Sequence, residues 1–490
     1  MFLTATKTPA LCEATRARDA GLAAALLSGG DERLVADPVS GRNRYGLTAR
    51  PAPDETFFSS STASTITPRG WRAAATAWRR LHCHDPRERQ CFPAWFDDIR
   101  RRVAAFAGAG EAILTASGTD AELAALAIAD DAAAARPITN IVVGPGETGR
   151  GVPLAAGGLH FQSSARHRRL AGWEDRDIRV ERVEIRGPGG FPRSASEVDA
   201  EVLVKAEAAL AQGRAVIAHL LEVSKTGLSG FSRAAASKLR EGAPGRVFVL
   251  ADCCQMRGSP SRIGELLDRG FLVAVTGSKF FCGPPFCGAV LFPDCLRARL
   301  KNFRLPEGVA AQTARYDWPA CLRGGSEGFA CHANIGLGLR WEAALAEMAT
   351  FAAVPPALAE KIARNFRALA IERAGQAGLR LLDEASGGSA WARTILPIAA
   401  PRSAEQAAEL QRALRRPAGA WGEAARVFHV GQAVAIGPDQ ALRVCLGAPT
   451  VSDIAALCGS GVPFERALAP LAADLSALFA KWTFLLNARP

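Results

Sequence analysis

VAVTGSKFFCGPPFCGAVLF, residues 273–292, places one lysine, Lys279, among small, aromatic and apolar residues. Burying an ammonium group without a partner costs several kcal/mol. A lysine in this setting therefore either meets an anion, or gives up its proton and becomes a nucleophile. Thr276 and Ser278 add hydroxyl groups beside it, and the following GPP forces a turn. The stretch predicts a buried strand, a functional loop and a second buried strand.

The composition is that of a globular protein. Of the 490 residues, 49% are hydrophobic and 22% are charged, which suffices for a large core and a second domain. No apolar run reaches the ~20 residues of a membrane span, and the N-terminus lacks the pattern of a signal peptide. We expect a cytoplasmic protein that does not bind a membrane.

Charge and cysteine content argue against a nucleic-acid-binding protein and against a disulfide-stabilised one. The net charge of +11 comes from arginines spread along the chain, without a basic stripe interleaved with aromatic residues, so we expect no nucleic-acid partner. The twelve cysteines show no regular pairing, and several lie in apolar segments. Reduced thiols are therefore favoured over a disulfide framework.

The order of apolar runs predicts an α/β fold. Strand-like and helical segments alternate between residues 111 and 292, and their continuous apolar strands indicate a mostly parallel sheet covered on both faces. We expect an N-terminal arm (1–70), a large domain (71–340) and a smaller C-terminal α+β domain (341–490). Ligands of such sheets collect at the carboxyl ends of the strands.

Two further features are expected at the edge of the sheet where the carboxyl ends of the strands meet, which we call the mouth and which holds Lys279. An apolar strand ends in Asp252, with Gln255 three residues later, and a buried carboxylate needs a cationic or proton-donating partner. Another strand is followed by Ser117, Gly118 and Thr119 at the start of a helix. Free amide groups and the helix dipole suit a phosphate there, although the hydroxyl groups are equally suited to capping the helix.

Together these features match the needs of pyridoxal phosphate: an anion cradle, a carboxylate that keeps the pyridine nitrogen protonated, and an amine for a Schiff base. The motifs SGTDAE, ADCCQ, TGSKFFCGPPFCGAVLF, RGGSEGFACHANIGLGL and ALRVCLG occur in this order. In them the chain resembles the fold-type I pyridoxal-phosphate enzymes, within the group of class V aminotransferases and cysteine desulfurases. The resemblance implies a large domain built on a seven-stranded sheet and a homodimer with shared active sites.

The resemblance also assigns roles to individual residues. Lys279 would be the Schiff-base lysine, Asp252 the partner of the ring nitrogen and Gln255 a donor to the ring hydroxyl. The phosphate would be held by residues with hydroxyl or small side chains, namely Ser117, Gly118, Thr119, Thr276 and Ser278, with Ser326 reaching the partner subunit's cofactor. Arg443 would bind the α-carboxylate of an amino-acid substrate, as a planar guanidinium does well.

A missing cysteine and the motif at residues 219–227 indicate the type of reaction. A desulfurase needs a mobile cysteine some two dozen residues before the carboxylate-binding arginine, and residues 415–443 contain none, which leaves Cys282, Cys287 and Cys331 as alternative candidates near the cofactor. HLLEVSKTG, residues 219–227, is closer to the aminotransferase pattern. We expect transamination with a keto acid as acceptor. The alternatives are a β- or γ-eliminating lyase of desulfurase type and a non-catalytic binding protein.

Some features are left open. The residue that stacks on the ring is unassigned, with Thr148, His160 and His219 as candidates. GPGETGRG, residues 144–151, lacks the Lys-Ser/Thr of a P-loop, so we reject a nucleotide triphosphate site. The cluster of His82, Cys83, His84 and Cys91 lacks zinc-finger spacing, and a loop is favoured over a metal site. Residues 59–70 are either a polar linker or an ordered arm at the substrate entrance.

Overall fold

The computed structural model describes residues 19–83, 85, 90–161, 168–323, 328–382, 389–418 and 422–488. Its larger sheet has seven strands in the order β2-β8-β7-β6-β5-β3-β4. Their bounds are β2 Glu111–Thr115, β3 Ile138–Val143, β4 Ile178–Val183, β5 Ala215–Leu221, β6 Val247–Asp252, β7 Leu272–Thr276 and β8 Gly288–Phe292. Pairing is parallel from β4 to β7 and antiparallel where β8 joins β7 and β2. The mostly parallel α/β sheet predicted from the sequence is confirmed.

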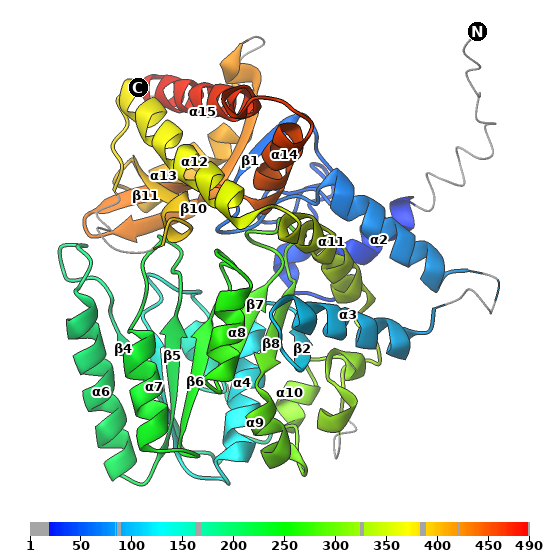
Figure 1. Cartoon of the computed structure of the whole chain (residues 1–490), viewed down its shortest axis with the longest axis vertical. Helices are drawn as coiled ribbons and strands as arrows, with labels where there is room; N and C mark the ends of the chain where they lie inside the picture. The colour runs from blue at the N-terminus through cyan, green and yellow to red at the C-terminus, as the bar shows by residue number, and fades with distance from the viewer. Residues whose placement is uncertain are drawn as a thin grey trace.

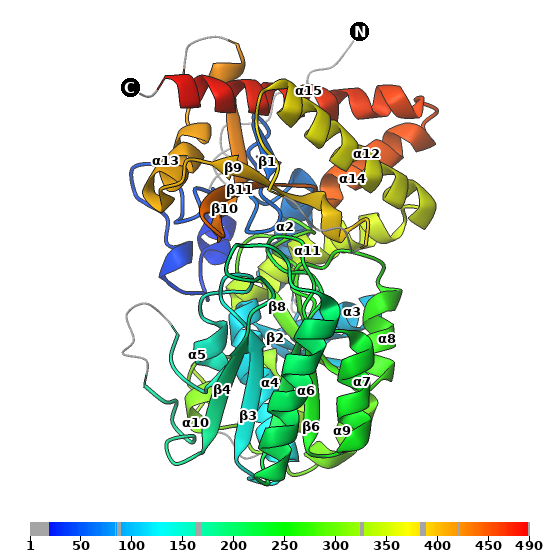
Figure 2. The same ribbon diagram turned by 90° about the vertical axis from the view of Figure 1, so that its left-hand side faces the viewer.

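Helices cover both faces of this sheet (Figures 1 and 2). One face is covered by α4 (Gly118–Ala132) and α5 (Val152–Ala156), and the other by α3 (Phe92–Phe106), α6 (Ala195–Ala211), α7 (Arg233–Gly242) and α8 (Ser261–Asp268). Alternate residues of one strand belong to different cores: Val247 and Val249 lie in one, and Phe248 and Leu250 in the other. This alternation explains why the strands read as unbroken apolar runs.

A second sheet lies beyond the carboxyl ends of the parallel strands (Figure 1). Its order is β1-β10-β11-β9, with bounds β1 Glu55–Phe58, β9 Ile395–Ala400, β10 Val427–Ile436 and β11 Asp439–Cys445. It is accompanied by α12 (Pro356–Gln376), α13 (Ala404–Leu414), α14 (Ala448–Gly459) and α15 (Phe464–Asn487). Since β1 pairs in parallel with β10, the N-terminal segment supplies an edge strand to a sheet otherwise built from the C-terminal part.

Between the two sheets lie α2 (Pro68–Leu81) and α11 (Ile335–Ala352), which pack on each other (Figure 1). Shorter elements complete the fold: α9 (Asp294–Arg297), α10 (Glu307–Ala310), and the 3-10 turns η1 (Glu32–Leu34), η2 (Ala298–Leu300), η3 (Arg315–Asp317), η4 (Ala320–Leu322), η5 (Ala392–Thr394) and η6 (Glu423–Ala425).

Residues 59–65 connect the two sheets. The Ser60 hydroxyl donates to the Leu446 carbonyl at 2.6 Å, and the Ser61 carbonyl accepts a hydrogen bond from Nε2 of Gln255 at 3.3 Å. Five of the polar residues in this segment are buried: Ser59, Ser60, Ser61, Ser64 and Thr65. Of the two alternatives for this segment, the structure shows an ordered arm.

Helix α15 departs from the expectation that no segment is long and apolar enough to cross a membrane. By length and composition it qualifies, and among the described residues it is the one helix that does. In the structure, Leu475, Leu478 and Trp482 of α15 are fully buried in the main core. Nζ of Lys481 donates to the carbonyls of Leu414 and Arg416 at 3.2 and 2.7 Å. These contacts are those of a core helix.

Candidate active site

The loops after β2, β6 and β7 meet at the mouth of the larger sheet. A Cβ atom added to Gly118 would lie 2.7 Å from Sγ of Cys254 and 3.5 Å from Cγ2 of Thr276. Oγ1 of Thr276 donates to the Cys254 carbonyl at 2.7 Å. The three sequence motifs predicted to share one site are therefore brought together, and a side chain at position 118 would force Cys254 to shift.

The loop after β2 caps helix α4 and leaves amide groups available. Ser117 is the N-cap residue: its hydroxyl accepts from the Asp120 amide at 3.2 Å and donates to the Asp120 carboxylate at 2.5 Å. The capping role weighed for Ser117 is thus the one observed. The amide groups of Gly118 and Thr119 belong to the first helical turn, where no intrahelical acceptor exists. An anion such as a phosphate fits at this end of the helix.

Asp252 and Gln255 lie on the turn after β6. Oδ1 of Asp252 accepts from the Cys254 amide at 2.9 Å, which holds the half-buried carboxylate at the end of its strand. Gln255 is only 3% exposed, and its Oε1 is a buried atom for which the described residues supply no hydrogen-bond partner. Leaving a buried amide atom unsatisfied costs about 1–3 kcal/mol. A hydrogen-bond donor of a cofactor fits beside Oε1, whereas Nε2, the donor predicted for the ring hydroxyl, already donates to the Ser61 carbonyl.

Aromatic anchors hold the loop that carries Lys279. Phe280 and Phe281 are buried, and their rings make edge contacts with each other and with Phe351. The Lys279 carbonyl accepts from the Cys282 amide at 2.9 Å, and the Phe280 carbonyl accepts from the Ala448 amide at 2.7 Å. The apolar neighbours of Lys279 thus fix its backbone, while its own side chain is only half-buried.

The ammonium group of Lys279 forms no hydrogen bond or ion pair within the described part of the chain. Its charge still acts on the site. Burial and then Asp252 raise the pKa of the Cys254 thiol, while Lys279 opposes that shift. Lys279 therefore lies near the turn that carries Asp252, as predicted. A lysine without a fixed partner at this position is suited to lose its proton and then attack an incoming carbonyl group as the neutral amine.

The two hydroxyl residues before Lys279 differ. Ser278 is buried, at 8% exposure. Thr276 already uses its hydroxyl proton on the Cys254 carbonyl, so in this structure it braces the turn after β6 instead of offering a donor to phosphate. The role predicted for Thr276 at the phosphate stays a prediction. Ser326, predicted to reach a partner's cofactor, lies outside the described residues.

Arg443, on β11, faces the same mouth from the second sheet. Its Nε donates to the Gln432 carbonyl at 3.1 Å, one Nη to the Lys225 carbonyl at 3.2 Å, and the other Nη to the Thr62 hydroxyl at 2.8 Å. A guanidinium has five N–H donors, so two are left for a ligand. Burial lowers its pKa, and the side chain is 3% exposed. A carboxylate fits this site.

The three candidates for the stacking residue make contacts of their own. His219 on β5 is a buried core residue, with Nε2 3.0 Å from Oδ1 of Asn140 and Nδ1 3.1 Å from the Glu122 carboxylate. The Thr148 hydroxyl donates within its own loop, to the carbonyls of Val143 and Gly144. The amide of His160 donates to the Arg168 carbonyl beyond α5. The stacking residue is still unassigned.

The cluster at the end of α2 is only partly described, because His84 lies outside the described residues. The His82 ring stacks on Trp78 with centroids 3.9 Å apart, and its Nδ1 is 2.9 Å from the Trp78 carbonyl oxygen. The described residues contain no group of side chains arranged to hold a metal ion.

Sequence reasoning missed two charged residues at the mouth, Lys225 and Glu147. Lys225, after β5, donates from Nζ to the carbonyls of Pro145 and Thr148 at 2.8 and 3.1 Å. Glu147 is buried and paired with Arg186 at 2.5 Å. A signal was present: a lysine at the end of an apolar strand in HLLEVSKTG, and a glutamate in the loop after another strand.

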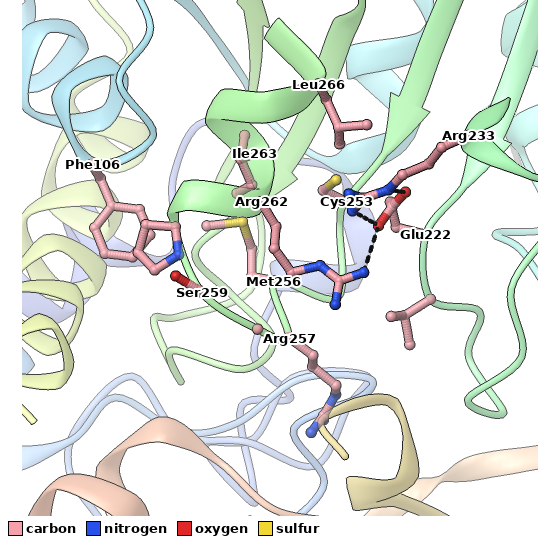
Figure 3. Close-up of a pocket in the computed structure, with 13 residues that line it drawn as sticks. Phe106, Glu222, Arg233, Cys253, Met256, Arg257, Ser259, Arg262, Ile263 and Leu266 are labelled. Atoms are coloured by element: carbon pink, nitrogen blue, oxygen red, sulfur yellow. Dashed lines mark hydrogen bonds and ion pairs between the residues drawn. The ribbon is translucent and has the colours of Figure 1, made fainter. Parts of the chain in front are cut away.

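A small cavity of about 30 Å³ lies behind the turn after β6. Figure 3 shows Cys253 and Met256 directed toward Ile263 and Leu266 of α8, and Glu222 paired with Arg233 and Arg262. Arg257 extends the other way, and donates to the carbonyl of Leu446 and the hydroxyl of Ser60. The cavity is too small for a cofactor, and Arg257 ties this turn to the second sheet.

A replacement at Gly118 tests the contact between the loops. In Gly118→Ala the new methyl group would overlap Sγ of Cys254, so we expect the free energy of unfolding to fall by about 1–3 kcal/mol, as for other overpacked sites. Removing the sulfur in Gly118→Ala/Cys254→Ala should restore part of the loss. Thermal and urea unfolding measure both. Gly242→Ala, with open space around it, is the control, and equal effects at the two glycines would contradict the packing described.

The comparisons with known proteins agree with this architecture. No family model matches the sequence, and no curated protein sequence is significantly similar to it. Solved structures do match. A cysteine desulfurase from Escherichia coli superposes with a TM-score of 0.53 at 14% identity, covering 88% of this chain and 94% of its own. An alanine–glyoxylate aminotransferase from Nostoc sp. gives a TM-score of 0.53 at 16% identity, covering 89% and 96%.

A cysteine desulfurase from Thermococcus onnurineus gives a TM-score of 0.52 at 12% identity, covering 83% of this chain and 94% of its own. These structural neighbours are class V pyridoxal-phosphate enzymes of fold-type I. The chain therefore has the fold-type I architecture. At these identities the likeness concerns the fold, and it includes both desulfurases and aminotransferases.

Proposed function

We propose that this protein is a pyridoxal-phosphate-dependent enzyme that acts on an amino acid, with transamination as its reaction. The observation that carries the proposal is the environment of Lys279. Its half-buried ammonium has no hydrogen bond or ion pair among the described residues, and it lies beside the turn of Asp252 and Gln255. A non-catalytic binding protein would have no need of this unpaired lysine.

The residues present fit the cofactor. The N-terminal amides of α4 would receive its phosphate, Asp252 would face the ring nitrogen, and the unsatisfied Oε1 of Gln255 would accept a hydrogen bond from the ring hydroxyl. When bound, the cofactor supplies an electron sink that makes the substrate Cα–H acidic. A carboxylate at the ring nitrogen favours the protonated ring, so Asp252 strengthens that sink.

The chain's own groups account for binding and proton transfer. Arg443 binds the substrate α-carboxylate through its two remaining N–H groups. With the cofactor bound, Lys279 would serve as the base, and its Nζ would accept the Cα proton of the substrate and hold it for the return transfer. The anchored backbone of Phe280 and Phe281 keeps Nζ in reach during both transfers.

The thiols near the site support transamination over sulfur transfer. Cys254, Cys282 and Cys287 are buried, and burial raises the pKa of the Cys282 thiol to about 12. A thiol with that pKa is protonated at neutral pH and is a poor sulfur acceptor. Cys331 is exposed, and partial burial followed by the Asp317 charge raises its pKa as well.

The test is a set of single-turnover reactions of the purified protein loaded with pyridoxal phosphate. Each amino acid is added alone, the absorbance is followed, and the released product is identified. Bleaching of the visible band with a keto acid and no ammonia supports transamination. Release of ammonia or sulfide would instead establish the eliminating lyase. A protein that takes up no cofactor would refute the proposal.

We also propose a homodimer with shared active sites. Light scattering of the loaded protein gives the oligomeric state, and a monomer that turns over at the full rate would contradict shared sites.

A further inference from the structure

Lys225 holds a cation close to the proposed substrate site without an acidic partner. The residue follows β5, and Nζ donates to the Pro145 and Thr148 carbonyls, both in the loop after β3. Within the described residues its ammonium forms no ion pair with a carboxylate. An ammonium has three donors, and two are accounted for. One N–H is left for a ligand.

The surroundings of Lys225 carry an excess of positive charge. Burial, then Arg443, lower its pKa to about 8, and Arg150 and Lys279 act in the same direction. Glu147 opposes them, but its carboxylate is already occupied by Arg186 at 2.5 Å and by the hydroxyls of Ser224 and Thr226 at 2.7 Å. The neighbouring carboxylate is thus committed to other partners.

The position of Lys225 relates it to the carboxylate site of Arg443. The Lys225 carbonyl accepts a hydrogen bond from Arg443 at 3.2 Å, so the two cationic side chains belong to adjoining parts of the mouth. Arg150, in the same loop as Thr148, is exposed and has no ion pair among the residues described. Lys225 and Arg150 are therefore two cations in addition to Arg443, which alone suffices to bind an α-carboxylate.

We propose that Lys225, assisted by Arg150, binds a second acidic group, so that the substrate is an amino acid whose side chain ends in a carboxylate. The inference rests on the proposed function, since it names the substrate class of that same site. The opposing interpretation is that Lys225 only clamps the loop after β3 to the loop after β5.

Paired substrates separate the two interpretations. The ratio of kcat/KM for glutamate to that for norvaline is measured in the wild type and in Lys225→Met, which keeps the apolar stem. A lost charged hydrogen bond corresponds to about a 10–100-fold fall in this ratio. Lys225→Arg should restore much of it. Lys205→Met removes a surface lysine and is the control. If the rates for both substrates fall by one factor, Lys225 is a clamp and the proposal fails.

Binding to the cofactor-free protein gives a readout that does not need activity. Calorimetry compares glutarate, with two carboxylates, and butyrate, with one. We expect the wild type to prefer glutarate and Lys225→Met to lose the preference. Equal affinities in the wild type would overturn the proposal. A protein that prefers glutarate but takes up no cofactor would refute the proposed function and leave the second acid site standing.

The preference for glutarate over butyrate should depend on pH. The ammonium is charged below its pKa of about 8 and loses its proton above it, so the advantage of glutarate should decrease as the pH rises through that value. The charged groups facing it are Glu147 and Arg150 from the loop after β3, Arg443 from β11 and Lys279 from the loop after β7. In Lys225→Arg the preference should persist at high pH. A preference independent of pH in the wild type would contradict the assignment.

Discussion

Lys279→Ala is expected to lower kcat by at least about 10³-fold, because it removes both the amine that bonds to the cofactor and the base that moves the Cα proton. Lys279→Arg should be equally inactive. An arginine keeps the positive charge but is not a nucleophile. Single-turnover rates with the best amino acid give the measurement, and thermal unfolding confirms that both variants fold.

The pair of variants decides the question that the apolar setting of Lys279 raises. If the lysine served only as the partner of an anion, Lys279→Arg would retain activity while Lys279→Ala would lose it. The structure places no anionic partner on the Lys279 ammonium among the described residues, which favours the nucleophile. Retention of activity in the arginine variant would contradict the account.

Asp252→Asn is expected to lower kcat by about 10²–10³-fold, the usual loss when one preorganised electrostatic group is removed from an active site. Asparagine keeps the shape, and its carbonyl oxygen still accepts from the Cys254 amide, so the turn after β6 should persist. Only the negative charge at the ring nitrogen is lost. Asp252→Glu keeps the negative charge but displaces it, so its kcat should lie between those of the wild type and Asp252→Asn.

Rates and spectra of the loaded Asp252 variants provide the measurement. The absorbance of the bound cofactor reports the protonation of its ring, so the asparagine variant should show a changed spectrum as well as a lower rate. A wild-type spectrum with a wild-type rate in Asp252→Asn would remove Asp252 from the mechanism.

Much of this architecture could be predicted from the sequence. The strands between residues 111 and 292 are buried on both faces, so each appears as a short apolar run bounded by turns. Because parallel strands end on the same edge of a sheet, the sequence predicts that the polar residues following β2, β6 and β7 lie at one mouth. The contacts of Gly118 with Cys254 and Thr276 confirm that convergence.

The remaining features depend on contacts between residues distant in the sequence. The pairing of β1 with β10 joins residues 55–58 to residues 427–430, and no local pattern predicts it. From the sequence alone, the hydroxyl of Thr276 could donate to a phosphate or to a carbonyl. The structure places the turn after β6 beside it, and the hydroxyl donates to the Cys254 carbonyl. Lys225 and Glu147 lie in separate loops, so their common surroundings became evident only in three dimensions.

The most direct test of the central claim is to identify the residue that bonds to the cofactor. The protein is loaded with pyridoxal phosphate, treated with borohydride to make the bond irreversible, digested, and examined by mass spectrometry. The account predicts the added mass on the peptide that carries Lys279, with none in Lys279→Ala. A label on Lys225, the other lysine at the mouth, or no label on the wild-type protein, would contradict it.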